Sequence, residues 1–255
     1  MKVISLQSGS NGNCVYVEAG GVRLLFDAGI SGKQAELRLA LHGRDIRQVD
    51  AVLVSHDHAD HVRCVGVYQR KFGLPIYVTE PTLRAALNYR ALGRLADVRH
   101  FTAGHTLRFN GVAVETVPTA HDGADGVGFV VDDGSRRVGI LTDLGHVFAA
   151  LGEVVASLDA VLLESNYDPE MLAYGPYPPH LKDRIRGPGG HLSNREAAEL
   201  LAAAAGRKMQ WACLGHLSQE NNDPRLALRT HRDILADGLP LHVAGRYEAT
   251  DVLEV

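Results

Sequence analysis

The sequence predicts a protein of the α/β (α+β) class, built from two packed β-sheets with helices on their outer faces. Short apolar runs bounded by Gly, Asn and Asp open both halves of the chain, and each half continues into helical patterns. The chain has 255 residues, of which 45% are hydrophobic and 22% charged, as in an ordinary globular protein with a sizeable core. No composition shift or low-complexity linker divides it, so we expect one domain over residues 1–255.

In the first half, apolar runs predict five strands, and polar patterns between them predict three helices. The strands are expected at Val3–Leu6, Cys14–Glu18, Val22–Asp27, Ala51–Ser55 and Ile76–Val78. Ser31 is suited to cap a helix, and Pro81 lies where the first turn of a helix accepts proline. The helices are therefore expected at Ser31–His42, Asp60–Lys71 and Pro81–Tyr89.

The second half repeats this organisation with six strands and three helices. The strands are expected at Val112–Val117, Gly128–Val131, Arg137–Leu141, Ala160–Leu163, Gln210–Leu214 and Leu241–Val243. Asp132-Asp133-Gly134 indicates a hairpin turn between two of them. The pattern Ser193-Asn194-Arg195-Glu196 is a capping box at a helix start. The helices are expected at Val147–Ala156, Ser193–Ala205 and Pro224–Leu235.

Composition also restricts the environment and the partners of the chain. No apolar run reaches the roughly 20 residues that span a bilayer, and the N-terminus turns polar too early for a secretory signal. The odd number of cysteines, with Cys14 and Cys213 in apolar runs, indicates buried free thiols in a reducing cytoplasm. We therefore expect a cytoplasmic protein without membrane contact. The net charge of −4 excludes a coat of positive charge, although a local basic groove remains compatible with it.

The run Ser55–His61 is the most informative motif of the chain. It follows the apolar run Ala51–Val54, and it holds three imidazoles and two carboxylates in seven residues. His56 and His58 are two apart, so an extended backbone directs them to the same side, and Asp60 and His61 follow where the chain must turn. Imidazole nitrogen and carboxylate oxygen suit zinc and manganese. A solvated polar loop is the alternative, but this density of ligand types behind a strand favours a metal site.

The pattern His-x-His-x-Asp-His resembles the signature of the metallo-β-lactamase-fold hydrolases. This sequence also has candidates for the later ligands of that family, and they occur in the same order as in the family. They are His121, Asp143 and His216, and each follows a β-like apolar run. The resemblance implies a four-layer αββα sandwich with two mixed β-sheets and a metal site at the cleft between them. Asp57 lies between two candidate ligands and would point away from them in an extended chain, so we expect it to be a structural partner.

Two divalent ions, zinc or manganese, are what this resemblance implies. It assigns His56, His58 and His121 to one ion, and Asp60, His61 and His216 to the other. Asp143 is suited to bridge them, because a carboxylate offsets the repulsion of two cations. Two ions ~3.5–4 Å apart can share one water-derived oxygen and generate hydroxide near neutral pH, here for attack on phosphorus. Asp60 is also a candidate catalytic residue that orients the hydroxide.

Two further residues suggest a proton donor. Glu164 ends an apolar run, and His191 lies just before a predicted helix. In the tRNA 3′-processing nucleases of the same superfamily, a Glu-containing and a His-containing segment occupy similar places, which implies that this pair orients and protonates the leaving oxygen. A charge-assisted hydrogen bond from Glu164 would keep His191 in the donor form. A helix-capping region or a buried polar pair is the alternative.

The stretch from Tyr174 to Gly187 mixes aromatic and cationic side chains between Glu164 and His191. Its candidates for substrate binding are Lys182, Arg184 and Arg186 for phosphate and Tyr177 for base stacking. A solvated loop shaped by its prolines is an equal alternative. Together with the segments Leu163–Asn166, Leu217–Asn222 and Ser8–Asn13, this stretch resembles the YycJ/WalJ group, which implies 5′-to-3′ exonuclease action on DNA.

The leading hypothesis is a dinuclear metal-dependent phosphodiesterase that hydrolyses nucleic acid. The chain lacks the Cys that familiar zinc β-lactamases place near Asp143, the extra cap domain of RNase J-like nucleases and the protruding arm of tRNase Z. A DNA end, an oligonucleotide or a small phosphodiester is therefore favoured over structured RNA. One alternative is a hydrolase of small cyclic or linear phosphodiesters, and another is a non-catalytic metal-binding module. A proton donor beside seven ligands disfavours the latter.

Overall fold

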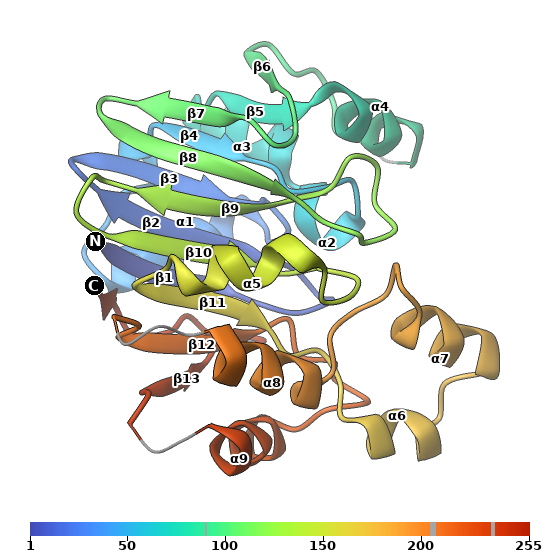
Figure 1. The fold of residues 1–255 in the computed structure, drawn as a ribbon. Coiled ribbons are helices and arrows are strands. Elements are labelled where there is room, and N and C mark those ends of the chain that lie inside the picture. Colours follow the sequence, from blue (N-terminus) through green and yellow to red (C-terminus); the bar gives the residue numbers. More distant parts are fainter. Residues whose placement is uncertain (90, 205–207, 236–237) are drawn as a thin grey trace.

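The computed structural model contains two seven-stranded β-sheets with helices outside them, which confirms the predicted fold class (Figure 1). It describes residues 1–89, 91–204, 208–235 and 238–255. Each half of the chain supplies most of one sheet, and the short C-terminal strand returns to the sheet of the first half. Both sheets are mixed, since each contains antiparallel and parallel neighbours.

The first sheet is antiparallel at its β14 end and parallel from β3 to β6. Parallel strands require crossover connections, and helices of the first half form them. In spatial order the strands are β14 (Leu253–Glu254), β1 (Lys2–Gln7), β2 (Cys14–Ala19), β3 (Val22–Phe26), β4 (Ala51–Leu53), β5 (Ile76–Thr79) and β6 (Val98–Phe101).

The second sheet follows the same plan, with an antiparallel meander that continues into parallel strands. The predicted turn at Asp132–Gly134 joins its antiparallel strands β9 and β10. In spatial order the strands are β13 (Leu241–Val243), β12 (Trp211–Gly215), β11 (Ala160–Glu164), β10 (Arg137–Leu141), β9 (Val127–Asp132), β8 (Val112–Pro118) and β7 (Thr106–Phe109).

Alternation along the strands divides the apolar side chains into three layers. In β11, Ala160 and Leu162 pack between the sheets, while Val161 and Leu163 face the helices of the second half. Phe26 of the first sheet meets Phe129 of the second with ring centroids 4.9 Å apart. Such an aromatic pair contributes about 0.5–1.5 kcal/mol beyond its buried area. The core between the sheets therefore fixes how their edges meet.

Helices cover the outer faces of both sheets (Figure 1). On the first sheet the apolar faces of α1, α3 and α4 pack with the 3₁₀ turn η1, and on the second those of α5 and α8, with α9 against β12 and β13. Among the described residues, no helix combines the length and the apolar character that a membrane crossing requires. The bounds are α1 (Gly32–Leu41), η1 (Ile46–Gln48), α2 (Ala59–Val62), α3 (Val65–Phe72), α4 (Glu80–Tyr89), α5 (Ala149–Ala156), α8 (Asn194–Ala204) and α9 (Pro224–Ile234).

Two short helices between β11 and α8 stand beside the sandwich, at the right of Figure 1. They are α6 (Pro169–Tyr174) and α7 (Pro179–Arg186), which share a small apolar cluster of Tyr167, Leu172 and Ile185. The alternative of a solvated loop at Tyr174–Gly187 does not hold for most of this stretch, because Pro179 begins the helix α7, which extends to Arg186. The basic, aromatic stretch thus belongs to a pair of short helices that pack on a shared apolar cluster.

The single helix predicted at Asp60–Lys71 is wrong, since the structure divides it into α2 and α3. Carbonyl groups that would continue the helix bond to neighbouring loops instead. Asp60 O accepts from Asn13 N at 2.7 Å, and His61 O accepts from Ala28 N at 2.7 Å. Cys64 N in turn donates to Ala28 O at 2.9 Å. These tertiary bonds end α2 after one turn, and they tie the motif to two loops of the first sheet.

Other sequence predictions differ from the structure only at element ends or by omission. Strands β6, β7 and β14 and the turn η1 were not predicted, and residue 205, the predicted end of α8, lies outside the described residues. The capping box is confirmed, with Glu196 N donating to Ser193 Oγ and Ser193 N to Glu196 Oε2. Cys14 and Cys213 are free and buried, and burial raises the pKa of both thiols to about 12, which makes them unreactive.

Candidate metal centre

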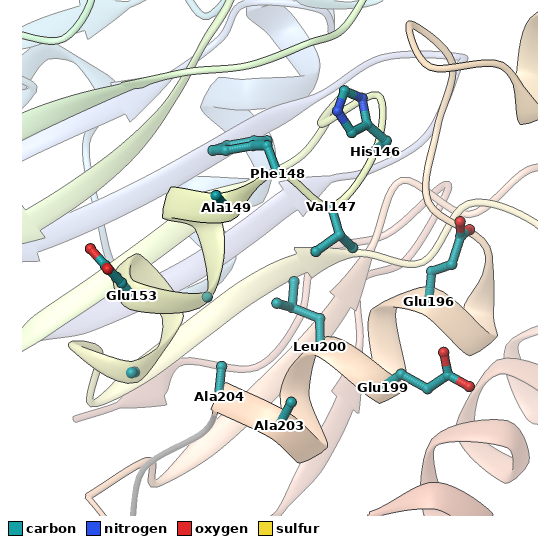
Figure 2. Close-up of a pocket in the computed structure, with 12 residues that line it drawn as sticks. His146, Val147, Phe148, Ala149, Glu153, Glu196, Glu199, Leu200, Ala203 and Ala204 are labelled. Carbon is teal, nitrogen blue, oxygen red and sulfur yellow. The ribbon is translucent and has the colours of Figure 1, made fainter.

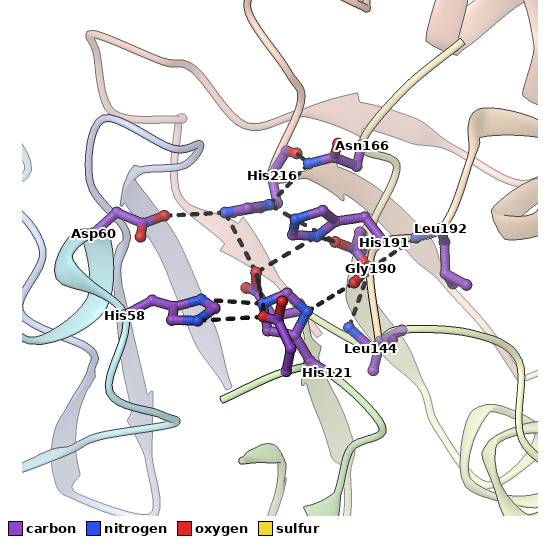
Figure 3. A network of polar contacts seen from close by, with 12 residues as sticks. His58, Asp60, His121, Leu144, Asn166, Gly190, His191, Leu192 and His216 are labelled. Atoms are coloured by element: carbon purple, nitrogen blue, oxygen red, sulfur yellow. Dashed lines mark hydrogen bonds and ion pairs between the residues drawn. The ribbon is translucent and has the colours of Figure 1, made fainter. Parts of the chain in front are cut away.

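The seven predicted ligands gather where strands of both sheets end. Figure 3 shows four of them, His58, Asp60, His121 and His216, directed toward one another. His56 and His58 follow β4, and Asp60 and His61 lie on α2. The others follow β8, β10 and β12, so both sheets contribute to one site. These last three residues are His121, Asp143 and His216. Residues that are far apart in the sequence therefore lie close together in space.

These side chains form two groups with a carboxylate between them. His56, His58 and His121 offer ligand atoms within 4.8 Å of one another, and so do Asp60, His61 and His216. Asp143 Oδ2 lies 3.3 Å from His61 Nε2. Its Oδ1 lies 3.7 Å from His121 Nε2 and 3.6 Å from His216 Nε2. Asp143 thus faces both groups at once, which is the position that a shared ligand requires.

Two buried polar atoms at the centre of the cluster have no hydrogen-bond partner in the described part of the chain, which shows whether the seven side chains suit metal ions. His56 Nε2 and Asp143 Oδ2 are buried, and neither has a hydrogen-bond partner among the described residues. His58 Nδ1 and His121 Nε2 also converge, at 3.2 Å. Buried polar atoms are nearly always satisfied, so two neighbouring acceptors without a hydrogen-bond partner in the described ranges indicate a place that suits a cation. With imidazole nitrogen and carboxylate oxygen as the donors, the residues fit divalent metal ions.

Three of the imidazoles are oriented by partners of Nδ1. His121 Nδ1 donates to Gly190 O at 2.7 Å, and His61 Nδ1 donates to Asp27 Oδ2 at 2.7 Å. Ser55 Oγ donates to Asp27 Oδ2, so it accepts from His56 Nδ1 at 2.9 Å. Each bond leaves Nε2 directed into the cluster, as hydrogen bonds behind metal-binding histidines do. The sequence pattern did not indicate this role for Asp27 and Ser55, although both follow buried strands that end at the site.

Two asparagines complete the group around Asp60. Asn13 Nδ2 lies 3.1 Å from Asp60 Oδ2 and 3.0 Å from His61 Nε2. Asn166 Nδ2 donates to His216 O at 2.7 Å and lies 3.1 Å from His216 Nδ1. His216 Nε2 lies 3.3 Å from Asp60 Oδ2. Both asparagines belong to segments that carried the family resemblance, which was the available signal for them.

Charges at the centre are strongly coupled. Burial alone would raise the pKa of the Asp143 carboxyl, but His216, His61, His56 and His121 together hold that pKa well below its ordinary value. For His61, burial would lower the pKa, yet Asp27, Asp143 and Asp60 raise it well above the ordinary range. Burial lowers the pKa of His56 well below its ordinary value. Carboxylates thus surround one edge of the cluster with negative charge, which favours a bound cation.

Three residues of the site have left-handed backbone conformations. The φ angles are +64° at Asp27, +57° at Asp143 and +54° at His216, and each residue follows the end of a strand. Such conformations cost of order 1–3 kcal/mol for residues other than glycine, and they persist where surrounding contacts hold them. Here they turn the chain sharply at the sheet edge, so that the side chain points toward the cluster. This strain is a second observation that marks the site as functional.

Changing Asp27 to asparagine tests the orientation of His61. Asparagine tolerates the left-handed conformation, so the backbone is preserved while the charge behind His61 is lost. We expect metal affinity to fall by about 10–100-fold, as for other partners behind metal ligands. Metal content after dialysis against graded chelator would measure this. Asp50→Asn, at an exposed carboxylate that accepts from Arg23 N, is the control; equal metal retention by both variants would contradict the role of Asp27.

Glu164 and His191 form the predicted pair beside the cluster, and Figure 3 shows His191 next to His216 and His121. His191 Nδ1 lies 2.6 Å from Glu164 Oε1, and Glu164 is completely buried. Glu164 Oε2 accepts from Leu144 N at 3.1 Å and from Leu192 N at 3.2 Å, which fixes the carboxylate. His191 Nδ1 also lies 3.7 Å from Asp143 Oδ1. The ring of His191 therefore lies beside both groups, with its centroid 4.7 Å from that of His121 and 5.2 Å from that of His216.

Helix α7 reaches the cluster through one ion pair. Arg184 Nε and Nη2 lie 2.6 and 2.9 Å from the two oxygens of Asp122, whose Oδ1 is 3.3 Å from His58 Nε2. Lys182 Nζ donates to Ala173 O, and Arg186 pairs with Asp183. Tyr177 packs on the small apolar cluster under α6 and α7. Of the four predicted substrate-binding residues, Arg184 is thus the one held beside a candidate ligand, His58; Asp122 was not predicted.

Asp57 points away from the ligands. Its Oδ1 accepts from Ala124 N at 2.7 Å, which anchors the loop that follows His121. As predicted, this carboxylate is a structural partner in the middle of the motif. It holds the loop of the second sheet against the motif of the first.

A groove elsewhere on the molecule has different chemistry (Figure 2). It has a volume of about 900 Å³ and lies between α5 and α8, with an apolar floor that includes Val147, Phe148 and Leu200. The side chains of Glu153, Glu196 and Glu199 line it. An acidic rim repels phosphate, so this groove does not suit a nucleic-acid strand. The polar cluster at the strand ends remains the site of interest.

Two packed sheets with outer helices, and a His/Asp cluster at the strand ends, define the metal-dependent hydrolases of the metallo-β-lactamase fold. The chain belongs to the β-lactamase superfamily: the model of the "Beta-lactamase superfamily domain" matches residues 22–212. All ligand candidates except His216 lie inside this match.

The chain is similar to two exodeoxyribonucleases. Over 235 residues the chain is 39% identical to the exodeoxyribonuclease WalJ of Streptococcus pneumoniae, covering 91% of this chain and 87% of that protein. It is 34% identical to the exodeoxyribonuclease YycJ of Bacillus anthracis, with 91% and 88% covered. Among solved structures, the metallo-β-lactamase-fold protein YhfI of Bacillus subtilis aligns over 98% of both chains with a TM-score of 0.74 at 18% identity, which shows the shared fold.

Proposed function

We propose that the chain is a single-domain exonuclease, over residues 1–255, that hydrolyses DNA in the 5′-to-3′ direction with two divalent ions, zinc or manganese. The observation that carries this proposal is the 2.6 Å contact between Glu164 and His191 beside the seven-ligand cluster. A metal-binding module needs no proton donor, whereas hydrolysis of a phosphodiester must protonate a basic leaving oxygen. The similarity to WalJ and YycJ supports DNA as the substrate.

Each residue of the site has a distinct part in this reaction. Ions held by the two ligand groups would lower the pKa of a coordinated water and polarise a phosphoryl oxygen. Asp60 faces His61 and His216, and it would accept a hydrogen bond from the attacking water and so orient it. His191 would donate a proton to the leaving oxygen from the ring nitrogen that faces away from Glu164. Glu164 would keep the ring oriented and favour its protonated form.

The cations of α7 would bind the phosphate backbone. Arg184 is half exposed beside the ligand His58, and Arg186 is exposed on the same helix. A strand whose scissile phosphate lies at the cluster would pass this helix. The Arg184–Asp122 pair would exchange its carboxylate for a phosphate at little cost, because both are anions that a guanidinium binds through two hydrogen bonds.

Neutralising α7 is expected to weaken DNA binding without harming the chemical step. In a Lys182→Gln, Arg184→Gln, Arg186→Gln variant, each lost phosphate contact should reduce the slope of log K against log salt by about 0.7–0.9. Fluorescence anisotropy with labelled DNA at several salt concentrations would measure the slope. Turnover of bis-p-nitrophenyl phosphate should remain unchanged. Arg195→Gln, at an exposed helical arginine on α8, is the control; an equal loss on both substrates would assign α7 a structural role.

A comparison of substrates tests the proposed function as a whole. Purified protein with manganese or zinc would receive end-labelled DNA, labelled RNA and bis-p-nitrophenyl phosphate side by side. We expect shortening of DNA from its 5′ end. Turnover of the small ester alone would instead identify a hydrolase of small phosphodiesters. Metal binding without turnover of any substrate would identify a non-catalytic metal-binding protein.

A further inference from the structure

A second cluster of cations lies next to the loop Ser8–Asn13, apart from the metal ligands. It lines a cavity of about 380 Å³. Two arginines, Arg38 and Arg63, are part of the wall, and the rest consists of neutral side chains that include Gln7, Asn11, Ser31 and Gln34. The described residues that line the cavity include no carboxylate.

Arg38 is a buried charge without a counter-charge. It is 8% exposed, and its guanidinium donates to Leu6 O at 2.9 Å, to the side chain of Gln7 and to Tyr247 O. Within the described ranges no carboxylate lies within ion-pair distance, and Glu248 acts on it only from farther away. Buried charges in proteins are normally paired. The neutral carbonyl groups hold the guanidinium in place and leave its charge available.

Arg63 directs a second uncompensated charge at the same cavity. It follows Asp60 by three residues and caps the C-terminus of α2. Its Nε donates to Gly29 O at 2.6 Å, and its Nη2 donates to Asn11 O. No carboxylate pairs with it in the part of the chain that the structure describes. Because α2 also carries Asp60 and His61, this cation is connected to the metal centre by one turn of helix.

The start of α1 adds to the positive potential. Ser31 caps this ten-residue helix by accepting from Gln34 N, and both residues line the cavity. The first turn contains Lys33 and no acidic residue. Acidic residues are usually favoured there, since the N-terminal end of a helix attracts anions. Two fixed guanidinium groups and a helix N-terminus therefore surround one cavity, which is the chemistry that recognises a phosphate group.

We propose that this cavity binds a phosphate group and that, during nuclease action, it holds the 5′-terminal phosphate of the DNA strand outside the scissile linkage. The second part rests on the proposed function. A terminal phosphate carries more charge than an internal one, so two guanidinium groups would distinguish a phosphorylated end from a hydroxyl end. The connection through α2 would place that end at a fixed offset from Asp60.

Two oligonucleotides of one sequence, with a 5′-phosphate or a 5′-hydroxyl, test the proposal on the metal-loaded full chain. The unmodified protein should show a KM about tenfold lower for the phosphorylated strand, as one charge-assisted contact provides. Arg63→Gln should remove this difference by raising the KM for the phosphorylated strand to that for the hydroxyl strand. Arg38→Gln, with folding checked by circular dichroism, should do the same. Arg108→Gln, at an exposed arginine of β7 outside the cavity, should keep the difference.

A measurement of phosphate binding tests the cavity independently of the nuclease reaction. Inorganic phosphate, at ionic strength matched with chloride, should raise the Tm of the unmodified protein more than that of Arg63→Gln. If the phosphate shift is lost in Arg63→Gln but the two oligonucleotides behave alike, the cavity binds free phosphate. Equal phosphate shifts in both proteins would overturn the proposal. If the unmodified protein cleaves neither oligonucleotide, the nuclease function fails, and the Tm comparison still decides whether the cavity binds phosphate.

Discussion

Replacement of Asp143 with asparagine is expected to abolish hydrolysis of DNA and to reduce the number of bound metal ions. Asp143 is the carboxylate that faces both ligand groups, and its Oδ2 is buried without a hydrogen-bond partner among the described residues. An amide offers one neutral oxygen, so it would neither bind two cations well nor offset their repulsion. The loss should exceed the roughly 10–100-fold typical of residues behind the ligands. Metal analysis and DNA turnover would measure both effects.

Asparagine is chosen because it preserves the backbone conformation at residue 143, so that only the side chain changes. Asp143 has a φ of +57°, a conformation that asparagine adopts more readily than alanine does. Asp125 has a φ of +53° and lies outside the ligand groups, so Asp125→Asn is the same chemical change in the same conformation. We expect Asp125→Asn to retain both ions and full activity. Full metal content and activity in Asp143→Asn would disprove the shared-ligand role.

His191→Ala is expected to slow hydrolysis of ordinary phosphodiester linkages by roughly 10²–10⁴-fold, the usual range for general acid–base catalysis. A DNA leaving group is a basic alkoxide that needs a proton. A nitrophenolate leaves without one, so bis-p-nitrophenyl phosphate should lose much less rate. His191 is bonded through Nδ1 to Glu164 and lies outside the two predicted ligand groups, so metal content should not change. Turnover of both substrates and metal analysis of the same preparation would test this.

Two companion variants make the His191 result specific. Glu164→Gln should reproduce part of the defect, because the amide still accepts from Leu144 N and Leu192 N but favours protonated His191 less. His146→Ala removes a neighbouring imidazole that donates to Pro188 O outside the cluster, and it should leave both rates unchanged. Loss of a metal ion in His191→Ala would make His191 a ligand. Equal slowing of both substrates would make it structural.

The sequence predicted the members of the site better than the residues that support them. His56, His121 and the other ligand types stand out because imidazole and carboxylate side chains directly after apolar strands have few structural uses. Asp27 gives no such signal, since a single Asp after a strand is common in turns. Its role depends on the left-handed backbone that aims it at His61, which only the three-dimensional structure reveals.

The fold shows the same division between local and tertiary causes. Periodicity predicted the strands of both sheets that have continuous apolar runs, such as β10 and β11. It missed β6 and β7, whose exposed residues make them read as polar segments. It also joined α2 to α3, because the bonds from Asp60 O and His61 O to distant loops leave no trace in local sequence. Edge strands and interrupted helices are therefore where pattern alone fails.

The spread of the ligands over both sheets determines when the protein can first act during its synthesis. A chain leaves the ribosome from its N-terminus, and it can pair only the strands already made. The motif at His56–His61 emerges early, but His216 follows β12, which is one of the last strands of the second sheet. A ribosome-bound chain that ends before His216 lacks one of the candidate ligands of the second group. Chains that end before His216 are therefore expected to be inert towards nucleic acid, so that nuclease activity can begin only after β12 and His216 have been synthesised.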